Sequence, residues 1–311
     1  MLQFKDLKRL LPMHKEKLIA LETICRTKDG TKSSVCNSTE FNCRRDVPVF
    51  FLVLDGADLV GYLSVFLPEE SAAELNVLIH PDYRRRGIFT ELLQRAKAAL
   101  SSIRTKEYIF VCEPSSSDAI AAMLAMNARK RSSEYQMLLE NSEAISQSFR
   151  KGMSATDSLE TTIGKQKQIL CSRPGELLEA TPDDLPLLGR MNALFFETSE
   201  EMGEFFVEDS YYTPGITVYK YVITDKNKKT VPIGTVCFCE ESFSGNIFGL
   251  GILPEYRGHG YGKSLLQTLL ARIPADKKIY LQVSSQNAAA FQLYQKAGFK
   301  IVAQQDFWLL P

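Results

Sequence analysis

The sequence predicts an α/β (α+β) protein made of two tandem copies of one fold. Two observations carry this prediction: strand-like runs alternate with helical patterns, and the segments 76–94 and 250–267 repeat each other without a gap. A repeat of this length indicates duplicated domains. The matched pairs, each separated by 173 positions (257 − 84 for the arginines), are Gly61 and Gly234, Pro81 and Pro254, Arg84 and Arg257, Gly87 and Gly260, and Gln94 and Gln267.

Hydrophobic periodicity gives the elements of the first copy in order. A helical pattern opens the copy, three strand-like runs follow, and a glycine turn leads into a helix and a further strand. The expected helices are 4–26 and 87–101, and the expected strands are 49–54, 59–66, 73–79 and 107–113.

The second copy repeats this order. Its first helix is expected to begin at Thr181 as N-cap with Pro182 at the first helical position. Gly298 closes the last helix. The expected strands are 177–180, 217–224, 232–240, 246–252, 278–284, 299–303 and 306–310, and the later helices are about 260–272 and 286–297.

The domain boundaries follow from the repeat and from composition. The Ser-, Thr-, Lys- and Gln-rich stretch between the copies lacks sustained periodicity. We therefore expect a degenerate N-terminal domain over 1–145, a connector over 146–173 and a C-terminal domain, presumed catalytic, over 174–311.

Composition excludes several function classes. The 311 residues contain 37 Lys plus Arg and 37 Asp plus Glu, so no global basic field recruits nucleic acid or an anionic membrane. The longest uncharged apolar run, 47–54, is too short to cross a bilayer, and the start of the chain has no signal-peptide core. The expected location is cytoplasmic, with no nucleic-acid or membrane partner. The seven cysteines are expected as buried reduced thiols, and the three scattered histidines predict no metal site.

The stretch PEYRGHGYGKS, 254–264, indicates a phosphate site. A P-loop would need glycine at position 257, which is arginine, and a dinucleotide fingerprint would need G-x-G-x-x-G. The residues fit R-x-x-G-x-G, with Arg257, Gly260 and Gly262, between a strand end and a helix. Backbone N–H groups at a helix N-terminus form an anion nest. A glycine turn without a ligand is the alternative.

A second motif lies downstream. Asn287, Ala290, Tyr294 and Gly298 have spacings of 3, 4 and 4, so they lie near one face of a helix. Together the two motifs resemble those of the GCN5-related N-acetyltransferase (GNAT) superfamily, (I/V)-x-P-x-x-R-x-x-G-x-G and N-x-x-A-x-x-L-Y-x-x-x-G-F. The resemblance implies a twisted mixed sheet in each copy, with two central parallel strands splayed apart.

The resemblance also implies the ligands and the residues that hold them. The cofactor is acetyl-CoA or another short acyl-CoA, and the acceptor is a primary amine of a small molecule or peptide, attacked directly in a ternary complex. The implied cofactor-binding residues are Leu250, Gly251, Ile252, Arg257, Gly258, His259, Gly260, Tyr261, Gly262, Lys263, Ser264 and Asn287.

Tyr294 matches the general acid of the family, and a backbone N–H near Ile252 is expected to stabilise the oxyanion. Tyr294 as a packing residue is the alternative, and Asn287 either contacts the cofactor or only caps its helix. The general base stays open between Glu240, Glu241 and a water relay, because GNIFGLG at 245–251 has no acid.

An acidic stretch precedes the strands of the second copy. Its carboxylates either wall the acceptor cleft, which suits a cationic amine, or form a solvated helix face. They are Glu197, Glu200, Glu201, Glu204, Glu208 and Asp209.

The first copy departs from the motifs. Phe89 replaces the second turn glycine, Met123 takes the place of Tyr294 after a two-residue shift, and a thioether has no proton to donate. We expect a catalytically silent first domain that serves packing, orientation or acceptor binding. This layout is similar to that of mycothiol synthase and other tandem acetyltransferases. The rival hypothesis is a non-catalytic acyl-CoA sensor or interaction module.

Overall fold

The computed structural model of the chain describes residues 1–39, 41–140, 175–224 and 228–311. They divide into two compact units that the chain enters more than once. The connector expected at 146–173 lies outside the described residues. The first unit consists of Met1–Gln136, Ser284–Gln286 and Ile301–Pro311, and the second of the described residues within Met137–Val283 together with Asn287–Lys300.

The first unit is a sheet with strand order β1-β2-β3-β4-β5-β12, and β6 follows β12. Helix α1 packs on β3 and β4, α2 on β2, β3 and β4, and α3 on β5. The elements are β1 (Leu2–Leu7), α1 (Pro12–Asp29), β2 (Phe50–Asp55), β3 (Asp58–Glu69), β4 (Ala72–Ile79), α2 (Ile88–Ala99), β5 (Glu107–Cys112), α3 (Ser117–Ala125), β6 (Arg129–Leu139) and β12 (Lys300–Leu309).

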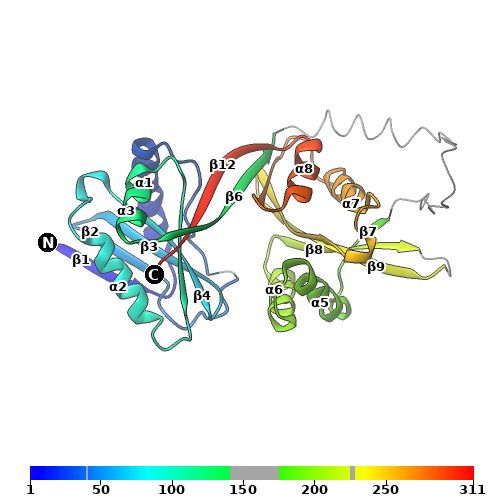
Figure 1. Cartoon of the computed structure of the whole chain (residues 1–311), viewed down its shortest axis with the longest axis horizontal. Helices are drawn as coiled ribbons and strands as arrows, with labels where there is room; N and C mark the ends of the chain where they lie inside the picture. The colour runs from blue at the N-terminus through cyan, green and yellow to red at the C-terminus, as the bar shows by residue number, and fades with distance from the viewer. Residues whose placement is uncertain (40, 141–174, 225–227) are drawn as a thin grey trace. The chain divides into compact units, whose positions relative to one another are not determined.

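Two expectations for these elements are wrong, and one strand was not expected. The pattern taken as one helix from 4 to 26 is a strand, β1, followed by a helix that begins at Pro12. The strands expected at 299–303 and 306–310 form the single strand β12. Figure 1 shows β12, in red, beside β6, in green, a strand that the periodicity did not reveal. Strand β12 pairs antiparallel with β5, so the last strand of the chain completes the first unit.

The second unit has strand order β11-β10-β9-β8-β7. Helix α5 packs on β9 and β10, α6 on β8, and α7 on β7 and β10. The helix expected from Thr181 begins as the 3-10 turn Pro182–Asp184 and continues as α5. The elements are β7 (Glu176–Glu179), α5 (Leu185–Phe196), α6 (Glu200–Tyr212), β8 (Ile216–Thr224), β9 (Thr230–Glu240), β10 (Ser244–Ile252), α7 (Tyr261–Leu270), β11 (Lys278–Ser284) and α8 (Ala288–Lys296).

The parallel strand pair of each unit is splayed, as the family resemblance implied. In the first unit β4 pairs with β5 only from Ala72 to Leu75, although β4 continues to Ile79. In the second unit β10 pairs with β11 only from Ser244 to Ile247, although β10 continues to Ile252. Each unit therefore has unpaired main-chain groups at the C-terminal end of its central strand.

The cysteines in the described part of the chain are free thiols. Cys237 is fully buried under α6, and burial raises the pKa of its thiol to about 12. Within the described residues no helix is both long and apolar enough to cross a membrane, and no cluster of His, Cys, Asp and Glu has the composition of a metal site.

Candidate functional site

The glycine turn of the second unit connects β10 to α7. A 3-10 turn, Pro254–Tyr256, follows the strand, and the next glycines adopt left-handed conformations: Gly258 with φ 79° and Gly260 with φ 85°. Gly260 is the N-cap of α7. No protein atom lies within 4 Å of a Cβ built at either glycine. The two positions therefore need glycine for their backbone conformation, and the space beside them is open for a ligand.

The turn presents N–H groups to this space. The first helical hydrogen bond runs from the N–H of Ser264 to the carbonyl oxygen of Gly260 (3.0 Å). The N–H groups of Gly262 and Lys263, in the first turn of α7, therefore have no acceptor within the helix. The helix dipole adds a partial positive charge at the same point. The turn thus has the free N–H groups that an anion nest needs, and anion binding there stays a prediction.

Arg257 ties the turn to the strand. Its Nε donates to the carbonyl oxygen of Ile252 (2.9 Å), and within the described residues no carboxylate pairs with its guanidinium. The ring Nδ1 of His259 lies 2.8 Å from the carbonyl oxygen of Arg257. The hydroxyl of the buried Tyr221 donates to Oγ of Ser264 (2.8 Å). The arginine side chain is exposed, so its positive charge is available to an anion at the turn.

The end of β10 carries a bulge. The register with β9 shifts between Phe248 and Gly251, and Gly249 has φ 61°. A Cβ built at Gly251 would lie 2.0 Å from Cδ2 of Phe195, so the phenyl ring of α5 lies directly on this strand. The sequence pattern did not reveal Phe195 as part of the site. Its ring lies beside the strand end where the pantetheine arm is expected.

Helix α8 brings the second motif to the turn. A Cβ built at Gly262 would lie 3.7 Å from Cδ2 of Leu293, the neighbour of Tyr294. Asn287 caps α8, since its Oδ1 accepts from the N–H of Ala290 (3.1 Å). Cofactor contact by Asn287 stays a prediction.

Tyr294 is 6% exposed, and its ring packs edge-on against Phe299 at 6.0 Å. Burial raises the pKa of its hydroxyl to about 12, so it stays protonated at neutral pH. Within the described residues this hydroxyl has no hydrogen-bond partner. It is therefore available to donate to a ligand.

The two glutamates considered as general base lie at the other end of β10. Glu240 pairs with Lys277, and Glu241 accepts from the hydroxyl of Ser244 (2.5 Å) where β10 begins. Gly245 pairs with Glu240, and the six residue-to-residue steps from Gly245 to Gly251 span roughly 20 Å along the strand. With the thioester at its expected place beside Ile252, neither glutamate reaches the amine, which favours the water relay.

The acidic stretch lies mainly on the exposed face of α6. Glu200, Glu201, Glu204 and Glu208 are exposed, whereas Phe206 on the same helix packs edge-on against Phe248 of β10 (5.9 Å). This favours the solvated helix face over a charged cleft wall for these four residues.

The first unit repeats the turn. Nε of Arg84 donates to the carbonyl oxygen of Ile79 (3.0 Å), and the N-cap Gly87 has φ 78°. Arg85 adopts the left-handed conformation (φ 61°) of its counterpart Gly258.

At two neighbouring positions beside the turn, the large residue of one copy corresponds to a small residue of the other. Phe89 and Ala122 of the first unit stand where Gly262 and Leu293 stand in the second. Phe89 packs edge-on against Phe110 (5.5 Å), so it fills space beside the nest.

The tyrosine position is also replaced in the first unit. Met123 is the seventh residue of α3 and Tyr294 the seventh residue of α8, and both side chains are buried. The helices end alike, because the N–H of Ala128 bonds to the carbonyl oxygen of Met123 as that of Phe299 bonds to Tyr294 (both 3.0 Å). The structure therefore aligns Met123 with Tyr294, as the predicted two-residue shift requires, and the first unit has no hydroxyl at this position.

Comparison with known proteins agrees with this duplication. The profile of the acetyltransferase (GNAT) family matches residues 17–126 and 190–299. A mycothiol acetyltransferase of Mycobacterium avium is 23% identical over 272 residues, which are 81% of this chain and 79% of that protein. N-alpha-acetyltransferase 50 of Danio rerio is 30% identical over 135 residues, 41% of this chain and 75% of that protein. A GCN5-related N-acetyltransferase of Sphaerobacter thermophilus has a similar fold, with TM-score 0.66, 14% identity and coverage of 100% and 96% of the two chains.

Proposed function

Since the chain belongs to the acetyltransferase (GNAT) family and is an enzyme of the acyltransferase class, we propose that its second unit transfers acetyl from acetyl-CoA, or another short acyl-CoA, to a primary amine. The acceptor is an amine of a small molecule or peptide. The observation that carries the proposal is the pairing, in this unit, of an open glycine turn with a buried tyrosine whose hydroxyl has no hydrogen-bond partner among the described residues.

The turn fits the diphosphate of coenzyme A. The space beside Gly258 and Gly260 is open, the N–H groups of Gly262 and Lys263 lack helical acceptors, and Arg257 has no carboxylate partner within the described residues. In this proposal the residues 257–264 hold the diphosphate. The unpaired main-chain groups of 250–252 bind the pantetheine arm.

Two groups of this chain act on the reacting atoms in the proposed reaction. Acetyl-CoA supplies the acyl group as an activated thioester. A backbone N–H near Ile252 donates to the oxygen on which negative charge develops. The hydroxyl of Tyr294 donates to the leaving sulfur, and its raised pKa keeps the proton in place until the thiolate forms. Water carries the proton away from the amine, because Glu240 and Glu241 lie a strand's length away.

The acceptor class rests on the relatives and on the local surface. One relative is named for mycothiol and another for an α-amino group, so relatives of this chain act on acceptors of different kinds. The wall formed by Phe195 beside Gly251 is apolar. An apolar wall favours the neutral form of an amine, which is the nucleophilic form.

The test follows the release of free thiol while the protein is incubated with acetyl-CoA and a panel of amines. The panel contains amino acids, polyamines, aminoglycosides and peptides. We expect turnover with at least one class of amine, and a loss of more than tenfold in Tyr294→Phe, about 1.4 kcal/mol of barrier. Tyr108→Phe, which removes a tyrosine hydroxyl from β5 of the first unit, is the matched control and is expected to keep full turnover.

Two results would contradict the proposal. Unchanged turnover in Tyr294→Phe would remove the tyrosine from the mechanism. Saturable binding of acetyl-CoA without transfer to any amine would favour the acyl-CoA sensor instead.

A further inference from the structure

The first unit contains a cavity of about 250 Å³ next to its glycine turn. Apolar side chains from the end of β4, from the start of α2, from β5 and from α3 line most of it. They include Leu78, Ile88, Phe89, Phe110, Ala119 and Ala122. The volume is slightly below the range of small-molecule pockets, so the cavity admits a narrow ligand.

The cavity has main-chain hydrogen-bonding groups on one side. Strand β4 stops pairing with β5 after Leu75, and the N–H of His80 bonds to Val60 of β3 on the opposite side. Main-chain groups alternate in direction along a strand, so the N–H and C=O of Val77 point toward the side that β5 has left. Buried main-chain groups need partners, and an amide in the cavity would supply both a donor and an acceptor.

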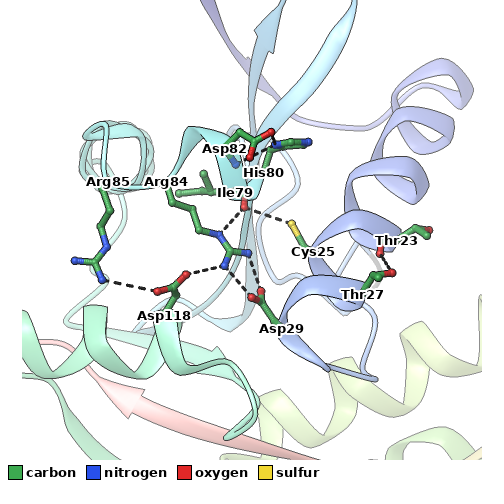
Figure 2. A network of polar contacts seen from close by, with 10 residues as sticks. All are labelled: Thr23, Cys25, Thr27, Asp29, Ile79, His80, Asp82, Arg84, Arg85 and Asp118. Atoms are coloured by element: carbon green, nitrogen blue, oxygen red, sulfur yellow. Dashed lines mark hydrogen bonds and ion pairs between the residues drawn. The ribbon is translucent and has the colours of Figure 1, made fainter.

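The charged groups at the mouth of the cavity neutralise one another. Figure 2 shows the guanidinium of Arg84 between two carboxylates, with Asp29 at 2.7 and 2.8 Å and Asp118 at 2.8 Å. Arg85 also lies 3.7 Å from Asp118. The hydrogen bond from Arg84 keeps the pKa of Asp118 below its ordinary value, so the carboxylate stays charged at neutral pH. An incoming phosphate would have to displace these carboxylates.

The second unit lacks this arrangement. Asp118 is the second residue of α3, and the second residue of α8 is Ala289. Arg257, the counterpart of Arg84, is exposed and has no carboxylate partner within the described residues. The two copies therefore differ in charge at the position where a phosphate would bind.

We propose that the cavity of the first unit is a second ligand site, which binds an uncharged, narrow molecule carrying an amide and rejects phosphate-bearing ligands. The apolar lining and the main-chain groups of Val77 supply the attraction. Asp29 and Asp118, by occupying Arg84, supply the rejection. The site is independent of catalysis in the second unit.

Trp308, the only tryptophan of the chain, does not line the cavity but is the cross-strand neighbour of Phe110, which does, so we use its emission as the readout. It pairs directly with Phe110 across β12 and β5, so the two side chains lie on one face of the sheet. The probes are pantetheine, which is neutral and carries two amides, and 4′-phosphopantetheine, which adds one phosphate. We expect pantetheine to change the emission of Trp308 saturably, and 4′-phosphopantetheine to bind at least tenfold more weakly.

Variants locate the effect. Ala122→Phe fills the cavity and is expected to abolish the response, whereas Leu124→Phe, on the exposed side of α3, is expected to keep it. Asp118→Asn removes one of the two carboxylates from Arg84 and the carboxylate beside Arg85, while Asp29 stays on Arg84. This variant is expected to narrow the difference in affinity between the two probes to about threefold.

Calorimetry on the full native chain and on Ala122→Phe gives a second readout that does not depend on the fluorophore. The inference is overturned if 4′-phosphopantetheine binds the native first unit as tightly as pantetheine. It is equally overturned if neither emission nor heat distinguishes the native chain from Ala122→Phe at about 10 mM probe.

Discussion

Gly260→Ala and Gly87→Ala form a matched pair that separates backbone strain from ligand binding. Both glycines are N-caps of the helix after the turn, with φ 85° and 78°, and no protein atom lies within 4 Å of a Cβ built at either. The cost of each substitution to stability is therefore conformational. A left-handed alanine costs about 1–2 kcal/mol, so both variants are expected to lose a similar amount of unfolding free energy.

Only Gly260→Ala is expected to weaken the binding of coenzyme A. Its Cβ projects into the space where we place the diphosphate. The loss of one charge-assisted hydrogen bond costs about 1.5–3 kcal/mol. That energy corresponds to a dissociation constant raised about 10-fold to 150-fold. Gly87→Ala is expected to leave the constant unchanged.

Isothermal titration with coenzyme A measures the dissociation constants, and urea unfolding measures the stability of both variants. If both variants lose the same stability and Gly260→Ala keeps the native dissociation constant for coenzyme A, the placement of the diphosphate is refuted. If the dissociation constant rises equally in both variants, the weaker binding does not come from the second unit alone.

Three further predictions concern packing, charge and pH. Gly251→Ala is expected to lower kcat/KM more than tenfold, because its Cβ meets the ring of Phe195 at 2.0 Å, and the added change Phe195→Ala is expected to restore part of it; no rescue would contradict the steric cause. Arg84→Met is expected to cost about 3 kcal/mol in urea unfolding, because it leaves Asp29 and Asp118 without their partner, whereas Arg257→Met is expected to cost under about 1 kcal/mol; equal costs would contradict this. Burial, followed by the charge of Glu134, raises the pKa of the Glu74 carboxyl to about 7. The unfolded chain therefore releases this proton at a lower pH than the folded chain, and the free energy of unfolding falls as the pH rises from about 4.5 to 7. Glu74→Gln is therefore expected to be more stable than the native chain at pH 8, by up to about 3 kcal/mol, and equal to it near pH 4; a difference that does not change with pH would contradict this.

The sequence predicted the duplicated fold and the glycine turns because those features are local. Left-handed glycines, a helix start and a strand end each have a signature within a few residues. The same signatures occur in both copies at a constant spacing, which makes the duplication recognisable. The first strand was missed because LQFKDLKRLL fits both periods: Leu2 and Phe4 alternate as in a strand, whereas Phe4 and Leu7 have helical spacing. The proline at position 12, typical of a first helical residue, marked the correct start.

The remaining features depend on long-range pairing, which periodicity does not encode. Strand β12 completes the sheet of the first unit by pairing with β5, nearly 200 residues earlier. Asp29 and Asp118 meet at Arg84 from two helices, and neither carries a motif. Phe195 contacts β10 from α5, and the only trace of this contact in the sequence is that residue 251 is a glycine, which has no Cβ to clash with the ring.

A crystal structure of the full chain with coenzyme A tests the central claim most directly. The account predicts a single coenzyme A in each chain, with diphosphate oxygens within hydrogen-bond distance of the N–H groups of 258–263 and the pantetheine arm along 250–252. A ligand bound elsewhere, with this turn empty at saturating concentration, would contradict it.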